Sequence, residues 1–401
     1  MKKKILVLSH AMELGGVERS LLGLLDAIDP EQYAVDLFLL RHEGELLEHI
    51  PPHINLLPAI PAYSTLARPM KDTLREGHLL LTAARLKGKL AAARYAKEHG
   101  HTDSIVSLEY SHKYTCPLMP AIRPEVEYDL AISYLTPHYF VDKKVRAKKK
   151  IAWIHTDYSK VQVNVPSELA MWGAYDHIVS ISDAVTEGFL SAFPSLREKI
   201  LPMSNILPEK LIRTQAEEEI PGSEMPADGS IRLLSVGRYC TAKNFDNVPD
   251  ICARLVKMGL DVKWYLIGFG GDEPLIRQRI SEAGMEERVI MLGKRDNPYS
   301  YMAACDLYVQ PSRYEGKCVS VLEAQMLGKP VVITRYPTSP SQLEDGVDGM
   351  IVPLDNEGCA QGIGALLNDP ENLEQLSNNC KKHIYSNCCE VEKIYQLAGD
   401  W

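Results

Sequence analysis

The stretch from Arg313 to Pro330 reads RYEGKCVSVLEAQMLGKP, and it sets the fold type of the second half of the chain. At about 100° per residue, one helix face gathers four apolar side chains around Glu323: Val319, Leu322, Met326 and Leu327. The pattern predicts a helix that begins near Gly316 and ends before Gly328, which Pro330 follows. The apolar run KPVVIT (329–334) comes directly after it, as in alternating α/β folds.

Glu323 would be a carboxylate on the buried face of this helix, and Glu315 would lie just ahead of its first turn. A desolvated, unpaired carboxylate is costly, so Glu323 requires a partner. Three kinds of partner fit: a basic side chain in a structural salt bridge, backbone donors, or a ligand with hydroxyl groups. The segment alone leaves these alternatives open.

Short apolar runs alternate with helical or loop sequence in both halves, which predicts parallel, doubly wound sheets. In the second half the runs are IRLLSVG (231–237), VKWYLIG (262–268), RVIMLG (288–293), DLYVQPS (306–312) and KPVVIT (329–334). In the first half, strands are predicted at 4–8, 34–40, 129–133, 151–154 and 177–181. We therefore expect an α/β fold of two Rossmann-like domains that face each other across a cleft, with ligand at the carboxyl ends of the strands.

The segment NILPEKLIRTQAEEEIPGSEMPADGS (205–230) is acidic, rich in proline and glycine, and without apolar periodicity. It is the predicted interdomain linker. We expect an N-terminal domain over residues 1–205, a C-terminal domain over 206–385, and a last helix, within 386–401, that can return to the first domain.

Composition is that of an ordinary globular protein, with 45% apolar and 24% charged residues in a chain of 401. The net charge of −9 argues against a general nucleic-acid binder. The apolar run from Ile5 to Leu8 is too short for a signal sequence, and no run is long enough to span a membrane. Nine cysteines without a C-x-x-C pair indicate reduced thiols and no metal site, so we expect a cytoplasmic protein.

Three further strand-to-helix turns contain unusual residues. In SHAMELGGVERS (9–20), Gly15 and Gly16 let backbone amides approach an anion or a sugar, although a tight turn also explains the pair. In SVGRYCTAKN (235–244), Arg238 and Lys243 can neutralise a diphosphate, although two solvated charges are the ordinary alternative. The first of these turns lacks the G-x-G-x-x-G spacing, which disfavours a nicotinamide enzyme. The turn IGFGGDEP (267–274) puts three glycines after a strand and ahead of Asp272 and Glu273, although a flexible connection capped at a helix N-terminus explains it equally well.

Together these four turns resemble those of the retaining glycosyltransferases of family 4, which have the two-domain GT-B fold. The resemblance lies in GRYCTAKN, IGFGGDE, LGKRDNPYSYMAACDLYVQPS (292–312) and the two glutamates, and it covers most of residues 231–352. In the first half only the GGVE turn and AWIHTDY (152–158) match. The resemblance implies an acceptor-binding first domain and a nucleotide-sugar-binding second domain.

The resemblance also implies roles for single residues. Arg238 and Lys243 would bind the donor diphosphate and stabilise the leaving group. Glu315 would contact the donor sugar near the reacting carbon, and Glu323 the ribose hydroxyls. His155 matches a histidine near the donor sugar and acceptor, whereas packing or surface roles are preferred for its neighbours His138 and Asp157.

The remaining donor contacts are implied at the first glycine turn, at the start of the helix and around the base: Gly16, Gly316, Lys317, Cys318, Val319, Arg295, Asn297 and Tyr299. Lys317 departs from the family pattern, because many relatives have Phe-Gly or Pro-Phe after the first glutamate. It is either another phosphate contact or a solvated side chain.

The implied reaction is transfer of a hexosyl unit from a nucleotide sugar to a hydroxyl acceptor, with retention and without metal or other cofactor. A UDP-sugar is the favoured donor, with GDP-mannose behind it. A two-carboxylate glycoside hydrolase is disfavoured because Glu323 would be committed to the ribose. The alternatives are a nucleotide-sugar 2-epimerase and a catalytically silent nucleotide-sugar-binding subunit of a transferase complex.

A basic, leucine-rich stretch in the first half indicates a membrane partner. Eight Lys or Arg lie from Arg68 to Lys97, and the acids in and beside this stretch are Asp72, Glu76 and Glu98. A second basic cluster runs from Lys143 to Lys150. Such a stretch can lie on an anionic membrane surface, although a solvated helix face is the alternative. The acceptor would then be a glycan or lipid-linked glycan of cell-surface polysaccharide synthesis, with the enzyme peripheral on the inner face of the cell membrane.

Overall fold

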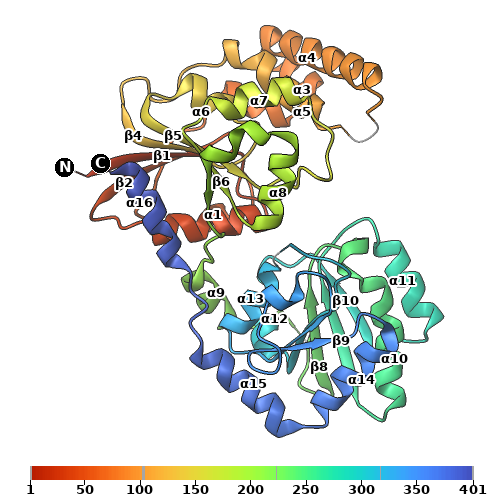
Figure 1. Ribbon diagram of the computed structural model, residues 1–401. Coiled ribbons are helices and arrows are strands. Elements are labelled where there is room, and N and C mark those ends of the chain that lie inside the picture. Colours follow the sequence, from red (N-terminus) through yellow and green to blue (C-terminus); the bar gives the residue numbers. More distant parts are fainter. Residues whose placement is uncertain (1, 102–103, 223, 317, 400–401) are drawn as a thin grey trace. The chain divides into compact units, whose positions relative to one another are not determined.

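The chain divides into two compact units (Figure 1). The structure is a computed structural model that describes residues 2–101, 104–222, 224–316 and 318–399. Unit 1 is formed by Met1–Pro208 and Asn387–Trp401, and unit 2 by Glu209–Ser386.

Unit 1 is built on a parallel sheet of seven strands in the order β3-β2-β1-β4-β5-β6-β7. This order, with the chain reversing direction across the sheet between β1 and β4, is the Rossmann arrangement. All five predicted strands are confirmed, whereas the short edge strands β3 and β7 were not predicted. The strands are β1 Lys3–Ser9, β2 Tyr33–Leu39, β3 Asn55–Leu56, β4 Tyr128–Ser133, β5 Ala147–Ile154, β6 His177–Ser180 and β7 Ile200–Pro202.

Helices cover the sheet of unit 1 and extend beyond it. The first helix, α1, buries Leu21, Leu24 and Leu25. Figure 1 shows α4, the longest helix of this unit, beside α3 and α5 at the outside of the unit. The helices are α1 Gly16–Ala27, α2 Pro61–Ser64, α3 Met70–Arg75, α4 Leu79–Glu98, α5 Val106–Thr115, α6 Tyr139–Lys144, α7 Val165–Gly173, α8 Asp183–Ala192 and α16 Glu392–Ala398.

The C-terminal helix α16 packs on unit 1. The Tyr395 ring stacks on Tyr33 with centroids 4.5 Å apart, and its hydroxyl donates to the carbonyl of Ala27. The same hydroxyl accepts from the backbone N–H of Asp29 at 2.8 Å. Helix α16 is therefore part of unit 1, although it follows unit 2 in the sequence.

Unit 2 repeats the Rossmann arrangement with six parallel strands in the order β10-β9-β8-β11-β12-β13. The five predicted strands are confirmed, and the sequence prediction missed β13. The elements are β8 Ile231–Val236, β9 Val262–Ile267, β10 Val289–Gly293, β11 Leu307–Gln310, β12 Val331–Thr334 and β13 Met350–Val352, with helices α9 Glu209–Ala216, α10 Val248–Lys257, α11 Glu273–Glu282, α12 Tyr299–Ala304, α13 Val319–Met326, α14 Asn356–Leu367 and α15 Pro370–Lys382.

Two sequence predictions about unit 2 are wrong in detail. The segment predicted as a linker contains helix α9, whose Ile212 is fully buried and which packs on α12. Helix α13 begins at Val319, not near Gly316, and its buried side chains lie all round it rather than on the predicted face. A helix this short between two layers has no solvent side, so a single apolar face cannot be read from its sequence.

The turns after β8 and β9 are joined by backbone hydrogen bonds at the carboxyl edge of the sheet. Tyr239 donates from its N–H to the carbonyl of Phe269 at 2.8 Å, and Asp272 donates to the carbonyl of Tyr239 at 3.1 Å. Gly268 has φ +153, and a Cβ there would collide with the carbonyl oxygen of Gly237. Glycine at position 268 thus allows the loops after β8 and β9 to lie in backbone contact.

We predict that Gly268→Ala destabilises unit 2 by about 1–3 kcal/mol, because the side chain forces the two turns apart. Gly271→Ala is the matched control, since a Cβ at Gly271 has no heavy atom within 4 Å. Urea unfolding of both variants measures the difference. Equal stability of the two would show that the contact is not needed.

Candidate functional site

Lys243 and Glu315 form an ion pair at the carboxyl edge of the unit 2 sheet. Lys243 follows β8 and Glu315 follows β11, the two neighbouring strands at which the sheet order reverses. Lys243 Nζ lies 2.6 Å from Glu315 Oε1, and their side chains are only 17% and 12% exposed. Reversal points of this kind are where doubly wound sheets bind ligands.

The turn around Asn244 aims Lys243 at Glu315. Asn244 adopts a left-handed conformation with φ 61, and its side-chain amide donates to the carbonyl of Pro311 at 2.8 Å. Arg313 forms a two-pronged pair with Asp246 and donates to the carbonyl of Thr241 at 2.7 Å. These contacts tie the turn after β8 to the turn after β11.

A second group of side chains orients Glu315 and the start of α13. Ser312 Oγ donates to Glu315 Oε1 at 2.6 Å, and Thr338 Oγ1 donates to the Glu315 carbonyl at 2.7 Å. The Cys318 N–H donates to Gln342 Oε1 at 2.7 Å. The sequence prediction missed Ser312, Thr338 and Gln342, because small polar side chains in loops have no recognisable spacing.

The charges at this edge favour an anion. Burial lowers the pKa of Lys243, but the neighbouring Cys318 and Glu315 outweigh it and raise that pKa above its usual range. Lys243 is therefore a fixed cation. Arg238 lies two residues after the end of β8 and is exposed, and no carboxylate within the described part of the chain pairs with it.

Glu323 has a hydroxyl partner within unit 2. It is 4% exposed, and Tyr299 donates to its Oε1 at 2.8 Å. A tyrosine at the start of α12 is a kind of partner that the sequence analysis did not consider. Binding of ribose hydroxyls by Glu323 stays a prediction.

Arg295 and Asn297 direct their side chains to the segment that opens unit 2. Arg295 pairs with Glu224 through two nitrogens, at 2.7 and 3.0 Å, and Asn297 donates to the carbonyl of Gln215 at 2.7 Å. The Asn297 side-chain Oδ1 accepts from the Tyr299 N–H at 2.9 Å, in the first turn of α12. Both side chains thus have structural partners, and their role near a base stays a prediction.

The backbone amides predicted to contact phosphate at the start of α13 lie in three different settings. Gly316 is exposed in the loop before the helix, Cys318 is the cap residue whose N–H is taken by Gln342, and Val319 is the first helical residue. Lys317 lies outside the described residues. Of this group, Gly316 and Val319 therefore remain the candidates for backbone contacts to a phosphate.

In unit 1, the glycine turn before α1 is closed by its own glutamate. A Cβ on Gly15 would collide with the carboxylate of Glu18, whereas one on Gly16 would meet nothing within 4 Å. The Glu18 carboxylate is the far end of a flexible side chain and can move, so this contact does not by itself require glycine at position 15. Gly16 is exposed at the first turn of the helix, and its predicted donor contact stays a prediction.

His155 follows β5 and belongs to a group of four histidines at the carboxyl edge of the unit 1 sheet. Neither ring nitrogen of His155 has a hydrogen-bond partner among the described residues, and burial lowers its pKa to about 3. Burial likewise lowers the pKa of His10 to about 4, and those of His112 and His138 well below the usual value. The group is therefore neutral at pH 7 and offers hydrogen bonds without charge.

His138 and Asp157 have the roles preferred for them. His138 is fully buried, with Nδ1 2.8 Å from Ser133 Oγ, and its ring packs against Trp172. Asp157 is exposed and accepts from the backbone N–H and the hydroxyl of Ser159. Both are explained by local structure.

Comparison with solved structures identifies the fold. An Anabaena protein, HepE, determined in complex with UDP is 19% identical, with a TM-score of 0.62 over 99% of this chain and 98% of that one. WaaG, a glycosyltransferase involved in lipopolysaccharide biosynthesis, gives a TM-score of 0.58 at 15% identity over 99% of this chain and all of that one. The fold is therefore GT-B, as predicted.

Sequence comparison gives a match to a family model over unit 2. Residues 216–383 match the model of glycosyl transferases group 1. The match covers most of unit 2 and none of the sheet of unit 1.

Two curated relatives each match about 150 residues of the chain. An alpha-D-kanosaminyltransferase of Streptomyces kanamyceticus is 29% identical over 37% of this chain and 39% of its own. A Campylobacter jejuni N-acetylgalactosaminyltransferase that acts on a diphospho-undecaprenol-linked sugar is 32% identical over 37% of this chain and 40% of its own. The chain spans about two fifths of the length of these relatives.

We predict that the histidine group makes unit 1 sensitive to acid. The folded pKa values lie below the unfolded value of about 6.5, so the stability they contribute is present above pH 6.5 and lost as the pH falls below it. His10 and His155 should each cost about 1.5 kcal/mol of stability between pH 6.5 and 5. Hydrogen exchange of peptides from β4 and β5 at both pH values measures this loss.

His155→Asn should remove one histidine's share of that pH dependence, and the exposed His383→Asn in unit 2 is the control. An unchanged slope in His155→Asn would contradict the assignment of His155 as a buried, neutral ring.

Proposed function

We propose that the protein is a retaining glycosyltransferase that moves a hexosyl unit from a nucleotide sugar, by preference a UDP-sugar, to a hydroxyl group of an acceptor. One observation supports it above the others: the Lys243–Glu315 pair at the point where the sheet order of unit 2 reverses. A cation and a carboxylate at one edge suit a donor that has a diphosphate beside a sugar.

The reaction breaks the bond between the anomeric carbon of the sugar and the β-phosphate oxygen, and forms a bond from that carbon to the acceptor oxygen. Lys243 and Arg238 stabilise the negative charge that grows on the departing diphosphate. The acceptor proton passes to this diphosphate on the face from which it leaves, which retains the configuration. Glu315 orients the donor sugar and stabilises positive charge at the reacting carbon.

We assign acceptor binding to unit 1. His155 would share a hydrogen bond with a sugar hydroxyl, which suits a neutral ring whose two nitrogens have no described partner. The Campylobacter relative, named for a lipid-linked substrate, favours a lipid-linked glycan as acceptor. Attachment to the inner face of the cell membrane as a peripheral protein belongs to the same proposal.

Replacement of the paired charges should separate donor binding from turnover. Lys243→Ala should weaken UDP binding about tenfold or more, because a half-buried phosphate contact is lost. Glu315→Ala should reduce turnover about a hundredfold and leave UDP affinity within about threefold, because its proposed contact is to the sugar. Calorimetric titration with UDP and nucleotide release from a panel of nucleotide sugars, with a membrane lipid extract as acceptor, measure both.

Arg277→Ala is the control, since its ion pair with Glu273 lies on the exposed surface of α11 in the same unit. Wild-type turnover in both site variants would overturn the assignment. A 2-epimerised sugar without glycosylated product would indicate the epimerase, and donor binding without any turnover the silent subunit.

The proposed use of Lys243 and Arg238 to stabilise the leaving group predicts that no metal is needed. Turnover should persist within about twofold after treatment with EDTA, because the protein's own cations neutralise the diphosphate. Loss of turnover on EDTA treatment, restored by magnesium or manganese ions, would contradict metal independence.

A further inference from the structure

Helix α4 presents a row of leucines to solvent. Leu79, Leu86 and Leu90 are 62%, 47% and 63% exposed, and their spacing of seven and four residues puts them on one face. Single exposed leucines are common, but a row on one helix face is not. The buried side of the same helix has Leu81, with the small residues Gly88 and Ala92.

The leucine row is not needed to hold α4 in place. A Cβ on Gly88 would lie 2.8 Å from the carbonyl oxygen of Tyr110, so α4 and α5 are packed backbone to backbone on the inner side. Arg85, also on that side, donates to the carbonyl of Arg68 at 2.8 Å. The packing of α4 is thus complete without the outward leucines.

Cations border the leucine row. Helix α4 has five basic side chains and one acid, Glu98, in a chain whose net charge is −9. Lys87, Lys89 and Lys97 are exposed and have no carboxylate within 4.0 Å in the described residues, whereas Arg94 pairs with Glu98 at 2.7 Å. An i, i+4 pair this exposed is weak, so Arg94 stays available to another anion.

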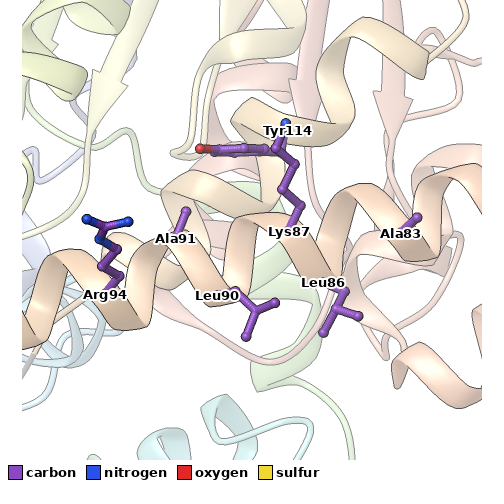
Figure 2. A pocket seen from close by; sticks show the side chains of 7 residues that line it. All are labelled: Ala83, Leu86, Lys87, Leu90, Ala91, Arg94 and Tyr114. Carbon is purple, nitrogen blue, oxygen red and sulfur yellow. The ribbon is translucent and has the colours of Figure 1, made fainter.

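A groove of about 500 Å³ lies where the apolar and basic residues meet. Its lining residues are Ala83, Leu86, Lys87, Leu90, Ala91, Arg94 and Tyr114. Figure 2 shows Leu86 and Leu90 projecting from one side of α4, and Lys87 and Arg94 from the other side, with Tyr114 of α5 next to Lys87. Leucines at one border and cations at the other match a molecule with an acyl chain and an anionic head group.

We infer that the α4 surface, comprising Leu79, Leu86, Leu90, Lys87 and Arg94, is the docking site of unit 1 for an anionic lipid bilayer. The leucines enter the boundary between head groups and acyl chains while the cations contact lipid phosphates, as in amphipathic interfacial helices. No helix in the described ranges is long and apolar enough to cross a bilayer.

The second basic cluster differs in kind. Lys143 pairs with Asp142 at 2.9 Å, and Lys148 pairs with Asp129 at 2.8 Å. Lys150 donates to the carbonyl of Asp142 at 2.7 Å. These cations are partly neutralised within unit 1, and no leucine row accompanies them, so charge complementarity favours α4.

Flotation with vesicles tests the inference on the full chain. The wild type should float with vesicles of equal parts phosphatidylglycerol and phosphatidylcholine at low salt and remain unbound with phosphatidylcholine alone. Leu86→Gln/Leu90→Gln and Lys87→Gln/Arg94→Gln should each reduce the bound fraction about tenfold, since glutamine preserves helix propensity.

The matched controls are on unit 2: Leu275→Gln on α11, and Lys257→Gln/Lys382→Gln, which changes the net charge equally. Controls that lose binding as much as the α4 variants, a wild type that ignores anionic vesicles, or equal binding to neutral vesicles would overturn the inference. So would a dimer in solution that Leu86→Gln/Leu90→Gln dissociates, which would assign the leucines to a second copy.

The docking inference depends on the proposed function only in that a lipid-linked acceptor requires a membrane. The docking inference and the proposed function can be refuted separately. Vesicle binding without turnover of any nucleotide sugar would refute the proposed function alone. Turnover of a water-soluble acceptor without vesicle binding would refute the docking surface alone. The circular dichroism spectrum and the hydrogen exchange of β4 and β5 in unit 1 should be unchanged in both α4 variants, which shows that unit 1 is folded.

Discussion

The half-buried ion pair between Lys243 and Glu315 is the interaction on which the candidate site depends. Burial of two charges is costly unless each has further partners, and here Ser312 supplies one by donating to Glu315. Removal of either partner would leave an uncompensated charge. The left-handed backbone at Asn244 and the Arg313–Asp246 pair hold Lys243 in position next to Glu315. The strained residue and the loop contacts thus both stabilise the ion pair.

Both units have the same strand order, but their carboxyl edges differ in chemistry. Unit 2 offers permanent charge, with Lys243 and Arg238 at its edge, whereas unit 1 offers neutral imidazoles such as His155. Permanent cations suit a diphosphate, and neutral rings suit sugar hydroxyls, which donate and accept but have no charge. One topology thus provides for two kinds of recognition, set by the residues that follow each strand.

The sequence predicted the ten longer strands, because buried parallel strands are continuous apolar runs. It missed β3, β7 and β13, which have two or three residues each, and α9, whose eight residues lie in an acidic segment. It singled out Lys243 and Glu315 from their positions after strands. It could not find that Ser312 donates to Glu315, that Tyr299 donates to Glu323, or that Arg295 pairs with Glu224, because these contacts depend on how the loops fold.

The amphipathic character of helix α4 cannot be read from the distribution of its leucines in the sequence. Leucines lie on its outer face as well as its inner one, so the two faces cancel, and only exposure separates Leu86 and Leu90 from Leu81. Gly88 reveals which face is structural, because close backbone packing needs no large side chain there. The inner face of α4 packs through glycine and alanine, so the exposed leucines contribute little to its packing. We infer an apolar contact outside the fold for them, and the cations beside these leucines favour an anionic partner.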